Sequence, residues 1–136
     1  MNPLMTYYLA KTEPSTYSID DLEKDRKTLW DGVHNHQAIA YIKQMKPGDR
    51  VFIYHSVNEK QIVGEAEVIS LPFENKADPR FSWAVELKFV KKCHGPTLAD
   101  CKANPLCKEF KLVTNSRLST MPVPEDIATW ISAYNG

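Results

Sequence analysis

The segment from Trp83 to Val90 constrains the fold most, because apolar and polar residues alternate along most of its length. Successive side chains of a β-strand point to opposite faces of a sheet, so the alternation predicts a strand with one buried and one solvated face. We expect the buried face to carry four large side chains: Trp83, Val85, Leu87 and Phe89. A half-buried strand of this kind is typical of antiparallel or mixed sheets.

Four other stretches complete a predicted sheet. The apolar run 50–55 predicts a strand that is covered on both faces. Residues 61–69 predict a neighbouring strand with a bulge or a bend at Gly64, because glycine weakens the interior of a regular strand. Two shorter strands are predicted at 6–10 and at 117–123.

Short helices are predicted between these strands. Capping-box patterns at Ser18 and Thr97 each mark the start of one, and two more should begin at Asn35 and at Pro124. The helices do not alternate regularly with the strands, which excludes a doubly wound parallel sheet. The pattern favours one α+β domain over residues 1–136, a mixed and mostly antiparallel β-barrel surrounded by short helices.

Composition limits the classes of function. Lys plus Arg and Asp plus Glu number 17 each, so a general electrostatic attraction to nucleic acid is absent and binding would need a local patch and a specific pocket. The three cysteines form no CxxC pair and do not suggest a disulfide framework. Neither a long apolar run nor a secretory signal is present, so we expect a cytoplasmic protein, nuclear if eukaryotic.

The densest group of polar and aromatic residues is the segment 30–37. Trp30 offers a flat surface for stacking, and the amides of Asn35 and Gln37 offer the donors and acceptors that read the edge of a base. Asp31 could accept a hydrogen bond from an exocyclic amine. An alternative is structural: Trp30 could fill the core, and Asp31 or Asn35 could cap the helix that follows.

Two further triplets lie where predicted strands end, a position at which pockets often form. The first is Lys11-Thr12-Glu13, and its alternative is a solvated turn. The second is Tyr54-His55-Ser56, but no GxSxG context surrounds Ser56 to support a nucleophile. The histidines at 34 and 36 match no zinc-ligand spacing, so we predict no metal site.

Eight short segments, in order over nearly the whole chain, together resemble one known family. They are residues 8–14, 17–22, 30–33, 45–49, 54–56, 62–64, 78–80 and 116–123. Their order and spacing are similar to those of the EVE domain, found in stand-alone bacterial proteins and in the thymocyte nuclear protein family. The resemblance implies a PUA-like fold, in which a small, partly closed barrel is surrounded by helices.

The resemblance also implies a function. EVE domains are similar to families whose pockets hold a single nucleobase, and they are linked to modified cytosine in DNA rather than to catalysis. The implied partner is nucleic acid that contains modified bases, more DNA than RNA, without cofactor, metal or membrane. Two alternatives remain: a reader of modified RNA or a free nucleotide, and an enzyme that uses Glu13, His55 or Asp31. The implied ligand-binding residues are Lys11, Thr12, Glu13, Trp30, Asp31, Gly32, Val33, His34, Asn35, Gln37, Tyr54, His55 and Ser56.

The sequence departs from the family pattern after Val33. Family members commonly carry arginine where this chain has His34 and Ile39, tyrosine where it has His36, and asparagine where it has Ala40. A mostly neutral histidine does not reproduce the rigid fork with which arginine binds phosphate. We therefore expect weak phosphate anchoring at neutral pH and, through His34, stronger oligonucleotide binding as the pH falls.

Overall fold

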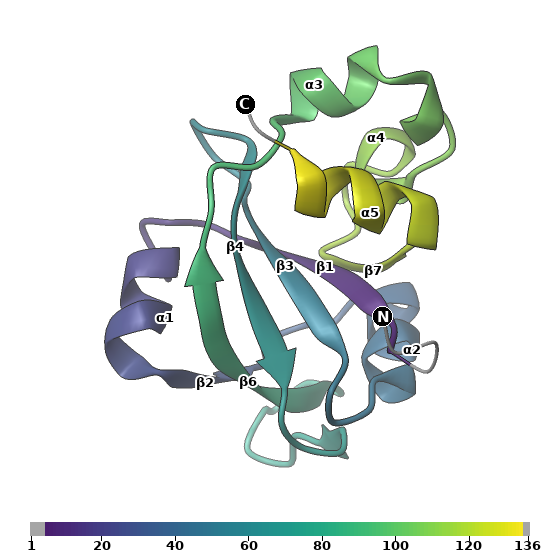
Figure 1. The fold of residues 1–136 in the computed structure, drawn as a ribbon. Helices are drawn as coiled ribbons and strands as arrows, with labels where there is room; N and C mark the ends of the chain where they lie inside the picture. The colour runs from purple at the N-terminus through teal and green to yellow at the C-terminus, as the bar shows by residue number, and fades with distance from the viewer. Residues whose placement is uncertain (1–4, 135–136) are drawn as a thin grey trace.

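The computed structural model describes residues 5–134, which form a seven-stranded sheet with short helices around it (Figure 1). The strands are β1 Tyr7–Thr12, β2 Lys27–Trp30, β3 Arg50–His55, β4 Gln61–Val68, β5 Phe73–Glu74, β6 Trp83–Lys92 and β7 Thr120–Val123. The helices are α1 Ile19–Asp25, α2 His36–Gln44, α3 Leu98–Ala103, the 3₁₀ turn Pro105–Cys107, α4 Lys111–Thr114 and α5 Glu125–Ala133.

The sheet is mixed and mostly antiparallel. Its strand order is β2-β6-β4-β3-β1-β7, and β5 pairs with β6 beside this path. Only β1 and β3 run parallel among the described pairings. The predicted fold class is confirmed with one correction: the sheet is open, because no backbone ladder within residues 5–134 joins the end strands β2 and β7.

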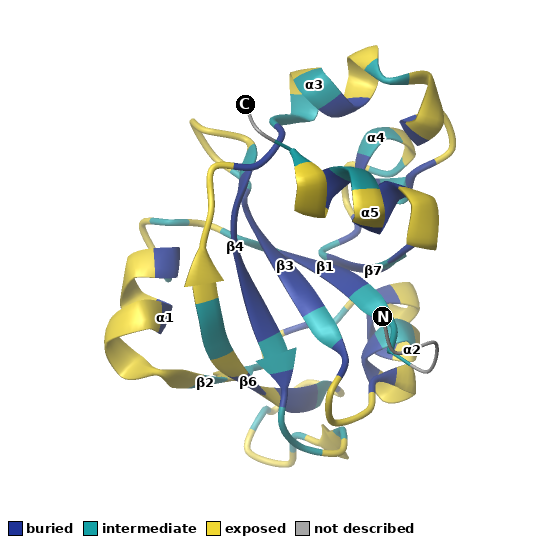
Figure 2. Cartoon of the chain, viewed as in Figure 1, coloured by how far each residue is buried: buried dark blue, intermediate teal, exposed yellow. Residues whose placement is uncertain are grey.

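The alternation in β6 has the predicted consequence. Val85 and Leu87 are fully buried, while Trp83 and Phe89 are partly buried and pack against the same core. Glu86 and the other polar residues of this stretch face outward and are exposed. The core therefore lies on one side of β6, and Figure 2 shows the buried sheet strands against the exposed outer faces of the helices.

The central strand β3 is covered on both faces, as its apolar run predicts. Its pairing with β4 shifts register between Ile53 and Tyr54, which confirms the irregularity predicted near Gly64. A Cβ atom on Gly64 would meet the side chain of Ile19 and would lie 2.9 Å from the carbonyl oxygen of Lys91. The missing side chain thus lets helix α1 pack directly on the sheet.

Both predicted capping boxes are present. The hydroxyls of Ser18 and Thr97 accept hydrogen bonds from the backbone of Asp21 and Asp100, whose carboxylates bond back to the capping residues. Asn35 caps α2 in the same manner, through a hydrogen bond that its Oδ1 accepts from Ala38 at 3.0 Å. These local bonds explain why the helix starts could be read from sequence.

One predicted boundary was wrong. The strand predicted from residue 117 begins only at Thr120, because residues 115–118 form a turn around Asn115. The start of α5 agrees with the prediction, because Pro124 is its N-cap residue and Glu125 and Asp126 lie in its first turn. Sequence reasoning also missed β2, β5, the 3₁₀ turn and α4, all of which are four residues long or shorter.

All three cysteines are free, and Cys101 and Cys107 are buried, so no disulfide framework is formed. No helix within residues 5–134 is long and apolar enough to cross a membrane.

Replacing Leu87 by alanine tests the buried face of β6. Its side chain is 1% exposed, so the change should lower the free energy of unfolding by about 2–5 kcal/mol in a urea melt. Lys88→Ala on the solvated face is the control and should change stability by less than about 0.5 kcal/mol. Equal effects for the two variants would contradict the assigned faces.

Candidate functional site

The two end strands of the open sheet are joined by a side chain. The indole Nε1 of Trp30, at the end of β2, donates a hydrogen bond of 3.1 Å to the hydroxyl of Thr120, the first residue of β7. Thr120 is fully buried, so this bond is shielded from water. We call the line between β2 and β7 the seam.

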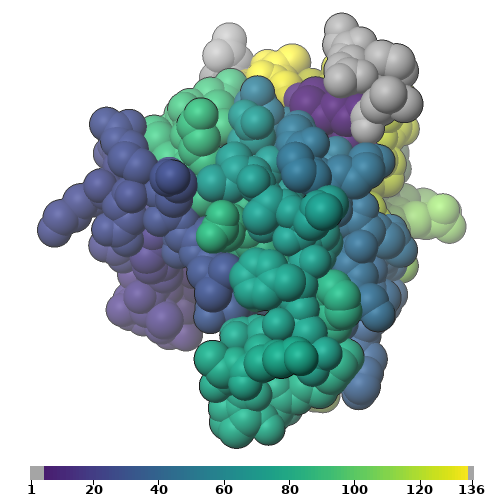
Figure 3. Space-filling view, turned by 90° about the horizontal axis from the view of Figure 1, so that it is seen from below, coloured from purple at the N-terminus to yellow at the C-terminus, as the bar shows by residue number. Residues whose placement is uncertain are grey.

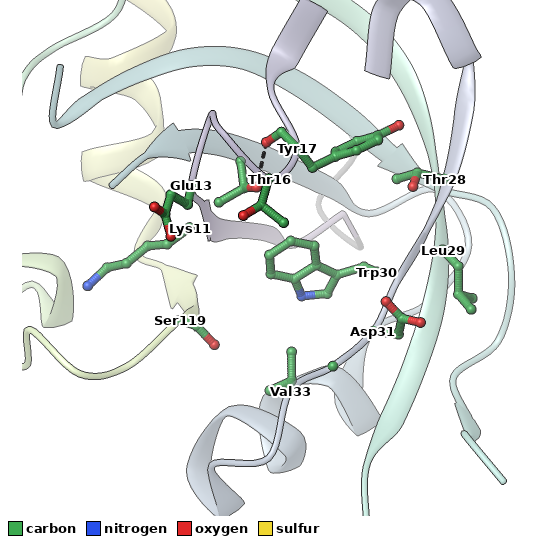
Figure 4. A pocket seen from close by; sticks show the side chains of 12 residues that line it. Lys11, Glu13, Thr16, Tyr17, Thr28, Leu29, Trp30, Asp31, Val33 and Ser119 are labelled. Carbon is green, nitrogen blue, oxygen red and sulfur yellow. Dashed lines mark hydrogen bonds between the residues drawn. The ribbon is translucent and has the colours of Figure 1, made fainter. Parts of the chain in front are cut away.

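A cavity of about 480 Å³ opens along the seam (Figure 4). Residues from three parts of the chain line it: the end of β1 and the turn after it, β2 with its following loop, and one residue before β7. They are Lys11, Thr12, Glu13, Thr16, Tyr17, Thr28, Leu29, Trp30, Asp31, Gly32, Val33 and Ser119. The volume lies within the range typical of small-molecule pockets.

Strand register explains why the indole faces this cavity. Trp30 lies opposite Val85 and Thr28 lies opposite Leu87, and both β6 residues point into the core. Directly opposed residues of an antiparallel pair share a face, so Trp30 also points inward. Its ring is partly buried and packs against the core. Trp30 is therefore both part of the core and a wall of the pocket, so the two readings of the sequence do not exclude each other.

The end of β1 forms the opposite wall. The backbone N–H of Lys11 donates to the carbonyl of Ser119 at 2.9 Å, and its ammonium donates to the carbonyl of Ser116 at 3.1 Å. Partial burial lowers the pKa of the Lys11 ammonium below its ordinary value. Figure 4 shows this ammonium directed away from the indole. Lys11 thus joins β1 to the segment before β7 and leaves the space in front of the ring free.

The turn after β1 is held by its own hydrogen bonds. The hydroxyl of Thr12 donates to the carbonyl of Tyr17 at 2.6 Å, and the backbone N–H groups of Thr16 and Tyr17 donate to the carbonyl of Glu13. The Tyr17 hydroxyl donates to Asp25 in α1 at 2.9 Å, and partial burial is the largest cause that raises its pKa. The turn is therefore held in place by contacts within the chain.

The charge of the pocket is negative. Among its lining residues, Glu13 and Asp31 carry carboxylates and Lys11 carries the one ammonium. Gly32 has a φ of +72°, and a Cβ there would meet nothing within 4 Å, so glycine serves the backbone bend after Asp31. Such a pocket suits a flat ligand that donates hydrogen bonds and is poorly suited to a phosphate.

Residues 54–56 were predicted to form a wall of the pocket, but they do not line this cavity. Tyr54 and His55 are 3% and 4% exposed, and neither they nor Ser56 line the cavity. The Nε2 atom of His55 accepts a hydrogen bond from the N–H of Ile19 at 3.1 Å, and its Nδ1 atom lies 3.1 Å from a carboxylate oxygen of Glu59. β3 lies at the centre of the sheet, so its end meets α1 rather than the seam.

Three predicted residues follow Val33, the last lining residue of its segment, and do not line the cavity themselves. Asn35 caps α2, which is the structural alternative stated for it, and Gln37 donates to the hydroxyl of Tyr41. The Nε2 atom of His34 lies 2.7 Å from a carboxylate oxygen of Asp78. His34 is therefore engaged by another part of the chain and does not line the cavity.

Five lining residues were missed by sequence reasoning: Thr16, Tyr17, Thr28, Leu29 and Ser119. Two of them lie in β2, which is too short to show a clear period. Within residues 5–134, no three His, Cys, Asp or Glu side chains gather as a metal site.

Comparisons with known proteins give one consistent family. A model of the EVE domain matches residues 6–134. Thymocyte nuclear protein 1 of Rattus norvegicus is 31% identical, with 90% of this chain and 70% of that protein covered. A protein of Rhodopseudomonas palustris solved by NMR has a TM-score of 0.85 and 36% identity, covering 93% of this chain and 90% of its own.

A third comparison concerns the fold alone. The human THYN1 protein, solved in complex with DNA that contains 5-methylcytosine, superposes with a TM-score of 0.81 at 24% identity, covering 93% of this chain and 95% of that chain. The match over 6–134 and the identity with the rat protein decide the family. The chain belongs to the EVE domain family.

Proposed function

We propose that this protein is a non-catalytic reader that takes one base of a nucleic acid into the pocket at the seam, with modified cytosine in DNA as its ligand. The observation that carries the proposal is the indole of Trp30, which forms a flat wall of a cavity of about 480 Å³. A base must leave its stack to be read in this way, and stacking on an aromatic ring returns about 1–3 kcal/mol.

The carboxylates of Glu13 and Asp31 favour a base that presents an amine. Cytosine carries a donor at its exocyclic N4, whereas thymine and uracil carry an acceptor at the same position. A carboxylate accepts hydrogen bonds and repels a carbonyl oxygen, so the lining charges select for cytosine over thymine. A methyl group on the base adds only about 0.8 kcal/mol per buried carbon, so selectivity for it should be modest.

The positions of the titratable groups support binding rather than catalysis. Acid–base or nucleophilic catalysis needs a base oriented by a partner beside the reacting atoms. His55 has such a partner in Glu59, but both are outside the pocket and the lone pair of Nε2 is used by Ile19. The DNA complex of the human THYN1 protein, which shares this fold, supports modified cytosine as the ligand.

Trp30→Ala tests the stacking wall. It should weaken binding of a single-stranded oligonucleotide with one 5-methylcytosine by about 1–3 kcal/mol. Stability should also fall, because the ring packs against the core, so Trp30→Phe is measured beside it as a variant that keeps a flat face. The Trp30→Phe variant should retain most of the affinity for this oligonucleotide. Lost stability with unchanged affinity in the alanine variant would contradict the role of Trp30.

Glu13→Gln and Asp31→Asn test the reading of the amine. 5-Methylcytosine and thymine carry the same methyl group, so paired oligonucleotides isolate the amine. The wild type should prefer 5-methylcytosine, and removing the accepting carboxylate should reduce that preference by about 1.5–3 kcal/mol. Glu109→Gln, an exposed acid outside the pocket, is the control. An unchanged preference in both variants would refute the assignment. Ribose and deoxyribose versions of each probe separate RNA from DNA.

A further inference from the structure

A lobe formed by residues 70–82 projects from the body of the molecule between β4 and β6. Figure 3 shows it in teal at the bottom of the view. It contains the short strand β5, and its tip is braced by backbone hydrogen bonds from Asn75 to Ser82 and from Asp78 to Asn75, at 3.0 and 3.2 Å. The lobe is therefore an ordered projection.

The lobe is tied to the rim of the pocket through Asp78. One oxygen of this carboxylate lies 2.7 Å from Nε2 of His34 and accepts from the hydroxyl of Ser82 at 2.8 Å, while the other accepts from the N–H of Arg80 at 2.9 Å. The hydrogen bonds from Arg80, His34 and Ser82 lower the pKa of Asp78 to about 2. His34 follows Val33, a lining residue, so the contact places the lobe beside the pocket.

The surface of the lobe combines aromatic and basic side chains. Phe81 is 54% exposed, and Leu71 and Phe73 are 69% and 41% exposed. Arg80 and Lys76 are exposed and form no ion pair among the described residues. The carboxylate of Asp78 is already engaged in three hydrogen bonds within the chain. Glu74 is an exposed acid in β5, where its backbone lies opposite Trp83 of β6.

We propose that this lobe is a second contact surface for the nucleic acid, on which Phe81 stacks with a base next to the one in the pocket while Arg80 and Lys76 contact the adjoining phosphates. The inference rests on the proposed function. Aromatic rings and cations side by side are the means by which proteins hold single strands, because every base has a face to stack and every linkage a charge. The pocket itself is negative, so phosphates must be met elsewhere.

His34 acts in this proposal as a positioning residue. Its ring reaches Asp78, so it holds the lobe against the rim instead of contacting phosphate itself. The cations that a nucleic acid meets on this side of the pocket are then those of the lobe. This assigns a role to the position at which the sequence departs from the family pattern.

The experiment separates the pocket from the lobe by the length of the probe. The probes are 5-methylcytidine, which reaches only the pocket, and a nine-nucleotide single strand with one central 5-methylcytosine. The double variant Phe81→Ser/Arg80→Gln should lower affinity for the strand about tenfold or more and leave nucleoside affinity within about twofold. Leu106→Ser/Lys102→Gln is the matched control, since Leu106 is 42% exposed and Lys102 is also exposed. These two residues lie in the 3₁₀ turn and in α3, at the other end of the molecule (Figure 1).

A second pair of variants tests the tie to the rim. His34→Ala should reproduce the selective loss of affinity for the strand, and His34→Gln, which can still donate to Asp78, should retain more of that affinity.

Unchanged binding of the strand by the Phe81→Ser/Arg80→Gln variant would overturn the lobe proposal and leave the pocket proposal intact. Self-association in sedimentation that Phe81→Ser abolishes, with unchanged strand binding, would overturn it in favour of a contact between copies. Failure of the wild type to bind either probe would overturn the proposed function as well.

Discussion

The hydrogen bond between the indole of Trp30 and the buried hydroxyl of Thr120 is the contact on which the site depends. It spans the gap between β2 and β7, where the sheet has no backbone ladder to close it. A hydrogen bond of this kind contributes about 1 kcal/mol net, but leaving a buried donor without a partner costs about 1–3 kcal/mol. The bond thus orients the ring and connects the two strands. The cavity opens along this seam, where the two end strands are not paired with each other.

The net charge of zero limits how this small domain could bind a charged polymer. With 17 positive and 17 negative side chains, long-range attraction to phosphate is weak. Affinity must come from a desolvated contact such as a stacked base, and from a few cations placed close to it. The pocket supplies the first and the projecting lobe beside it supplies candidates for the second. Such a protein should show a shallow salt dependence compared with a basic nucleic-acid-binding domain.

Several residues that look functional in the sequence serve the fold that positions the pocket. His55 accepts the N–H of Ile19 and so fixes the start of α1, which carries Asp25, the partner of Tyr17 in the pocket wall. Asn35 begins α2 directly after the lining segment 31–33. Short motifs in a small domain therefore contain both residues that could contact a ligand and residues that position them. The spacing of a motif does not show which residue is of which kind.

The sequence by itself determined the elements whose causes are local. The alternation in 83–90, the capping boxes at Ser18 and Thr97 and the glycine at 64 each act within a few residues, and the structure agrees with all of them. Resemblance to the EVE domain extended the prediction to the fold class, and seven of the thirteen residues it implied do line the cavity.

What only the tertiary structure decided is which strand ends meet. In the sequence, the ends of β1 and β3 look equally suited to line a pocket. The strand order puts β3 in the centre of the sheet and β1 beside the seam. Residues 11–13 therefore line the pocket, and residues 54–56 do not. The pairing of β2 with β6 turns Trp30 inward, toward Thr120, a residue ninety positions away. Such pairings depend on contacts between distant segments, which leave no periodic signal in either one.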